Sequence, residues 1–171
     1  MKTSRYSGFK GRKAFVGDIL TLIIIIFVLS ITIMTGYLML SKVNTAFQAT
    51  PDIGTQGQTI VNDATSKYTN LWDGIFAFLL VGLSLATAIS AYFIDTHPLL
   101  MPLLLIVLVA YVFVAASISN AYWSVASDTA FSGFAENFKV MYYVMTHLAW
   151  YALIEGFVVF MALFAKVNSG A

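Results

Sequence analysis

The stretch Ile19–Ser41, ILTLIIIIFVLSITIMTGYLMLS, decides the fold of this chain because it carries no Asp, Glu, Lys or Arg. About 20 helical residues cross a hydrocarbon core about 30 Å thick. Three further runs share this length and apolar character: Gly74–Ile94, Leu99–Ser119 and Met141–Ala165. Since lipid offers the backbone no hydrogen bonds, each run must form a helix. The sequence predicts an all-α integral membrane protein with four transmembrane helices in a bundle.

Composition supports this class. Of the 171 residues, 60% are hydrophobic and 10% are charged, whereas about 25% are charged in soluble domains. The connections are too short for a separate soluble domain. The chain has no cysteine, which excludes disulfides and thiolate chemistry. Its two histidines are far apart, which argues against a His-based metal centre.

The chain divides into a basic tail over residues 1–17, a transmembrane domain over 18–166 and a short tail over 167–171. Asp18 is expected to cap the first helix. The first apolar run is longer than the core of a signal peptide, about 7–15 residues, so we interpret it as a signal anchor. The tail holds five of the nine basic residues: Lys2, Arg5, Lys10, Arg12 and Lys13. By the positive-inside rule, both termini are cytoplasmic at synthesis.

Residues 42–73 form the longest polar connection, and apolar residues recur in its second half from Ile60 to Leu71. That spacing fits either a short amphipathic helix or a flexible loop. A tight turn is expected at residues 95–98. In the last connection, three phenylalanines share one helical face and predict an interfacial helix: Phe131, Phe134 and Phe138. Three further aromatic residues are expected at the same membrane interface: Trp72, Tyr122 and Trp123.

Glu155 is the one charged residue deep inside a predicted span. An intramembrane carboxyl is a candidate functional group that can carry a proton or bind a cation. The favoured interpretation is structural: a protonated Glu155 hydrogen-bonded to a Ser, Thr or Tyr of another helix, worth about 1 kcal/mol. His147 lies two turns earlier on a similar face, and the two residues could form a proton path.

Small residues recur every four positions on the second span, at Gly82, Ala86 and Ser90. Such rows allow helices to approach closely in lipid. We expect packing within the chain, with homo-oligomerisation as the alternative. The sequence carries no phosphate-binding loop, zinc-protease motif or nucleophile elbow, so we expect no enzymatic activity, cofactor or metal.

The segment AISAYFIDTHPLLMPLLLIVLVAYVFVAASISNAYW, residues 88–123, resembles small multi-pass membrane proteins of bacterial and archaeal viruses whose virions enclose a lipid membrane. The likeness extends at most over residues 74–123. It implies a non-enzymatic structural component of a virion membrane, with lipid and other membrane or capsid proteins as partners. The alternatives are a small proton or ion transporter using Glu155, and an accessory subunit of a membrane enzyme complex.

The basic tail yields the first prediction. Residues 1–13 have no apolar periodicity and are expected to order only against a partner such as anionic lipid, nucleic acid or an acidic protein. Replacing Arg5, Lys10, Arg12 and Lys13 by Gln should disturb orientation, because these charges dominate the positive-inside signal. Protease protection in membranes measures the effect. Unchanged orientation together with unchanged assembly would show that the tail has neither role.

Overall fold

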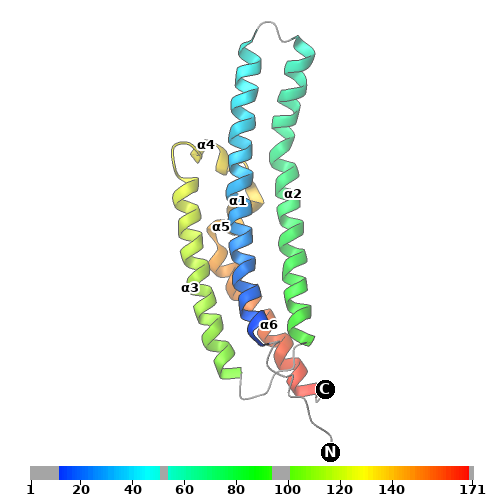
Figure 1. The fold of residues 1–171 in the computed structure, drawn as a ribbon, viewed down its shortest axis with the longest axis vertical. Helices are drawn as coiled ribbons and strands as arrows, with labels where there is room; N and C mark the ends of the chain where they lie inside the picture. The colour runs from blue at the N-terminus through cyan, green and yellow to red at the C-terminus, as the bar shows by residue number, and fades with distance from the viewer. Residues whose placement is uncertain (1–11, 51–53, 94–100, 170–171) are drawn as a thin grey trace, which may run out of the picture.

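The computed structural model describes the backbone of residues 12–50, 54–93 and 101–169, with side chains for 20–50, 54–93 and 102–166. This part of the chain is helical, and Figure 1 shows the arrangement. The helices are α1 (Arg12–Ala49), α2 (Thr55–Phe93), α3 (Met101–Ala126), α4 (Ser132–Ala135), α5 (Lys139–Thr146) and α6 (Leu148–Ser169).

Four of these helices, α1, α2, α3 and α6, are long and apolar enough to cross a membrane. The predicted fold class is therefore confirmed, and the protein is an integral multi-pass membrane protein. The start of α1 and the end of α6 lie at one end of the molecule, as four passes require (Figure 1). The predicted turn at 95–98 lies outside the described residues.

The first helix starts earlier than predicted. Because α1 begins at Arg12, Asp18 lies inside the helix and does not cap it. Arg12 and Lys13 are helical as well, so the expectation that the whole of residues 1–13 lacks a fold is wrong at these two positions. The remaining residues of the basic tail lie outside the described part of the chain.

Most of the predicted polar connection over residues 42–73 is also helical, since α1 continues to Ala49 and α2 begins at Thr55. α1 has 38 residues and α2 has 39, or about 57 Å each at 1.5 Å per residue. The two helices continue past the other elements as an antiparallel pair (Figure 1). We call Lys42–Ala49 and Thr55–Leu71 the polar hairpin. Its arms are joined by amides: Asn44 Nδ2 donates to Asn62 Oδ1 at 3.3 Å, and Gln48 Nε2 donates to the Gln58 carbonyl at 3.1 Å.

The predicted fourth span, 141–165, is interrupted. α5 ends at Thr146, His147 is non-helical, and α6 begins at Leu148. Side chains from other helices satisfy both ends of α5. At its start, the carboxylate of Asp73 in α2 accepts hydrogen bonds from the backbone N–H groups of Val140 and Met141, both at 2.9 Å. At its end, the Ser119 hydroxyl of α3 contacts the carbonyls of Met145 and Thr146, both at 2.9 Å.

An aromatic cluster holds the base of the polar hairpin. It consists of Tyr37, Tyr68, Trp72, Phe134 and Phe138, with successive ring centroids 5.5–6.3 Å apart. The Tyr68 hydroxyl donates to the Ile33 carbonyl at 3.3 Å, directly over Gly36, where a Cβ atom would collide with it. Gly36 therefore leaves room for the Tyr68 hydroxyl against α1.

The predicted interfacial helix carrying the three phenylalanines is wrong in extent, because α4 covers only four residues. Phe131 and Phe138 flank it, and Phe138 is fully buried in the aromatic cluster. Phe134 and Phe138 pack against Tyr37 of α1, and Phe138 also against Tyr68 of α2, so their spacing reflects packing within the protein. It did not mark a membrane-facing surface.

The capping of α5 by Asp73 gives the second prediction. Asp73→Ala should lower the free energy of unfolding by about 1–2 kcal/mol, because two N–H groups at a helix start lose their acceptor. Asp63→Ala is the matched control on the same helix. Asp63 forms only an exposed pair with Lys67 at 2.9 Å, so its loss should cost below about 0.5 kcal/mol. Unfolding in micelles, followed by tryptophan fluorescence, measures both; equal effects would contradict the prediction.

Candidate functional site

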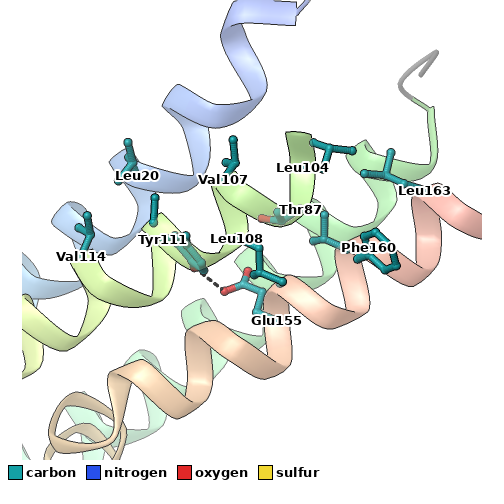
Figure 2. Close-up of a pocket in the computed structure, with 13 residues that line it drawn as sticks. Leu20, Thr87, Leu104, Val107, Leu108, Tyr111, Val114, Glu155, Phe160 and Leu163 are labelled. Carbon is teal, nitrogen blue, oxygen red and sulfur yellow. Dashed lines mark hydrogen bonds between the residues drawn. The ribbon is translucent and has the colours of Figure 1, made fainter. Parts of the chain in front are cut away.

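Glu155 lies in the first half of α6, buried against α3. It is 8% exposed, and Tyr111 of α3 is 7% exposed. The Tyr111 hydroxyl donates a hydrogen bond to Glu155 Oε2 at 3.1 Å (Figure 2). This is the kind of inter-helix hydrogen bond that the structural interpretation of Glu155 required. The sequence alone did not single out Tyr111 as the partner.

A second hydroxyl pair extends this polar group to α2. Ser84 of α2 forms a hydrogen bond with Tyr151 of α6, and Ser84 also interacts with Glu155. We call Ser84, Tyr111, Tyr151 and Glu155 the polar cluster. It connects three membrane-spanning helices, and the partners of the Glu155 carboxyl are neutral hydroxyls. A cation would be needed to offset an ionised carboxylate at this depth, so the cluster suits a protonated Glu155.

A cavity of about 200 Å³ lies beside the polar cluster, between α1, α2, α3 and α6. Glu155, Tyr111 and Thr87 supply its polar side chains, and Figure 2 shows Glu155 and Tyr111 together at its wall. The remaining lining residues are apolar: Leu20, Leu104, Val107, Leu108, Ala110, Val114, Gly156, Val159, Phe160 and Leu163. The site is thus an apolar chamber with one carboxyl.

Gly156 brings the two helices of the site together. A Cβ atom at this position would collide with the Leu108 side chain of α3. Because glycine has none, α3 and α6 approach closely one residue beyond Glu155, which puts Tyr111 within reach of the carboxyl. Sequence reasoning missed Gly156; its position next to the buried acid was the available signal.

His147 does not join Glu155. It lies exposed at the break between α5 and α6, where Nδ1 is 2.9 Å from the Tyr143 carbonyl oxygen. Its ring stacks on that of Tyr143, with centroids 4.5 Å apart. The prediction that His147 and Glu155 lie on a similar face assumed one continuous helix. Because the helix is broken at His147, that assumption does not hold. No hydrogen bond connects the two side chains within the described part of the chain.

The row of small residues on α2 points away from the bundle. Gly82, Ala86 and Ser90 are all exposed, and a Cβ atom at Gly82 would meet nothing within 4 Å. The expected packing within the chain is therefore wrong. The face of α2 that does pack carries Phe76, Leu80 and Ala91. Homo-oligomerisation through the small row stays a prediction.

The predicted interfacial aromatics separate into two kinds. Trp123 is 54% exposed, and its ring lies 6.3 Å from that of Tyr142. Trp72 is half-buried against Tyr68. Tyr122 is fully buried, and its hydroxyl has no hydrogen-bond partner among the described residues. Tyr122 is thus a core residue, which corrects the interfacial assignment.

Comparison with known proteins adds no relative: no family model, characterised protein or solved structure matches the chain. Within the described residues, no group of three or more His, Asp or Glu side chains is placed to hold a metal ion.

Proposed function

We propose that this protein is a non-enzymatic structural subunit of a membrane assembly, anchored by four helices and joined to its neighbours through the polar hairpin. The extension of α1 and α2 carries the proposal. Each helix is about 27 Å longer than a hydrocarbon core of about 30 Å, and part of this excess lies in the polar hairpin, on one side of the bundle (Figure 1).

The polar hairpin has features of a surface that meets other proteins. Its arms are fixed to each other by the amide contacts and to the bundle by the aromatic cluster, so its position is set before any partner binds. Preorganisation of this kind reduces the entropic cost of association. Its α2 arm exposes the large apolar side chain of Ile60, at 63%.

The assembly we propose is a virion membrane beneath a protein shell. The support is the resemblance of residues 74–123 to multi-pass proteins of membrane-containing viruses. In this setting the four spans occupy the lipid, and the polar hairpin meets capsid or membrane proteins. The protein should therefore be recovered in the lipid-containing fraction of purified virions, and its absence from that fraction would reject the viral version.

Shortening the polar hairpin tests the structural role. Deleting residues 43–49 and 55–61 removes two helical turns from each arm and keeps the register of what remains. The variant should insert into membranes as the full chain does, yet be lost from the assembly, because its contact surface is shorter. Native mass spectrometry of the gently solubilised assembly gives the readout. A variant that assembles at the full stoichiometry would contradict the proposal, and the partners identified would distinguish a virion from a membrane enzyme complex.

A second candidate function is proton or cation transport through Glu155, favoured by the position of its carboxyl at a cavity wall. Glu155→Gln keeps the side-chain shape and removes the titratable group. If Glu155 carries the ion, flux in proteoliposomes should fall at least about tenfold, the effect of roughly 1.4 kcal/mol. Ser90→Ala, on the exposed face of α2, is the control. Equal flux through the full chain and Glu155→Gln would reject transport.

A further inference from the structure

We propose that the cavity beside Glu155 is a binding site for the hydroxyl-bearing end of an uncharged apolar molecule, with a body about the size of a benzene ring. The proposal is independent of the role of the polar hairpin. It rests on the volume of the cavity, the chemistry of its walls and its position within the membrane-spanning helices.

The volume fixes the size of the ligand. An apolar cavity of about 150 Å³ in a protein core binds benzene. At about 200 Å³, this cavity accepts a ring with one or two substituents. Its walls are formed by Leu, Val and Phe side chains from several helices, which match an apolar body. Such a chamber with few polar groups is the usual form of a small-molecule site.

The carboxyl of Glu155 fixes the polar end of the ligand. It lies at the wall with only the Tyr111 hydroxyl, which bonds to Oε2, and Thr87 as polar neighbours inside the cavity. The Thr87 hydroxyl is already bonded to the Leu83 carbonyl at 2.8 Å. Ser84 also interacts with Glu155, but a carboxyl group has room for more than two hydrogen bonds, so Glu155 is the group best able to receive a new partner.

A hydroxyl fits this carboxyl better than an amine does. A hydroxyl group both donates and accepts, so it can pair with Glu155 whether or not the carboxyl holds its proton. A cationic amine would have to leave water and cross the apolar walls, which costs far more than the transfer of a neutral hydroxyl. An apolar molecule without a polar group would leave the carboxyl facing an apolar surface.

The ligand can enter from the bilayer. Ala110 of α3 lines the cavity and is itself exposed, while Val107 and Val114 on the same helix are half-buried. The α3 side of the cavity is therefore incompletely covered within the described part of the chain. A molecule dissolved in lipid, or the hydroxyl end of a membrane lipid, would reach Glu155 by this side.

The test uses three fluorinated probes of similar size with the full chain in lipid nanodiscs, followed by fluorine NMR. 4-Fluorophenol carries a hydroxyl, fluorobenzene lacks it, and 4-fluorobenzylamine is cationic. 4-Fluorophenol should bind saturably and roughly tenfold more tightly than fluorobenzene, the ratio expected for one hydrogen bond to a polar buried group. Equal binding of these two, or tighter binding of the amine, would overturn the proposed ligand class.

Two substitutions on α3 place the binding in the cavity. Val107→Phe fills the cavity and should abolish binding of both uncharged probes. Val109→Phe makes the same change on an outward position that is 55% exposed and should leave binding unchanged. Equal behaviour of the two variants would show that the probes bind elsewhere.

A third substitution, Glu155→Leu, tests the role of the carboxyl. In this variant fluorobenzene should still bind, while the tenfold advantage of 4-fluorophenol is lost. Retained fluorobenzene binding also shows that the variant is folded.

Native mass spectrometry of the protein extracted in native membrane discs identifies the source of the hydroxyl. A bound lipid mass that 4-fluorophenol displaces would identify the hydroxyl end of a membrane lipid as the natural occupant. A bound small molecule that 4-fluorophenol displaces would identify a free alcohol or phenol. A bound species of either kind that persists at saturating 4-fluorophenol would contradict occupancy of this cavity.

Discussion

The structure depends on one constraint: within lipid, every backbone N–H and C=O group needs a partner inside the protein. The constraint is most severe at α5, where the helix is interrupted at His147. Asp73 from α2 satisfies the start of α5, and Ser119 from α3 satisfies its end. These bonds permit the break, and they also fix α5 against two spanning helices and so set where α6 begins.

The polar cluster follows from the same constraint applied to side chains. A carboxyl in α6 must find a partner, and the Tyr111 hydroxyl provides one. Gly156 allows the close approach of α3 that this bond requires. Inter-helix hydrogen bonds in membranes contribute only about 1 kcal/mol each, so the cluster positions the helices more than it stabilises them. The cavity lies beside it, and within the described part of the chain its α3 side is incompletely covered.

The polar hairpin is stabilised differently, since much of it extends beyond the predicted spans. Amide side chains join α1 to α2 along its length, and the aromatic cluster packs its base against α4 and α5. The hairpin is therefore continuous with the bundle. This projection is the part of the molecule through which we propose that the subunit meets its partners.

By itself, the sequence determined the membrane class, the number of candidate spans and the presence of one carboxyl within a span, at Glu155, because length, apolarity and an isolated charge are local properties of the chain. It did not determine that α1 continues to Ala49 and α2 begins at Thr55, that the fourth span breaks at His147, or that Phe138 and Tyr122 are buried. Helical spacing shows which side chains share a face, and only the packing of other helices decides whether that face meets protein, lipid or water. For the same reason, Tyr111 and Gly156 acquired their roles only when α3 and α6 came together.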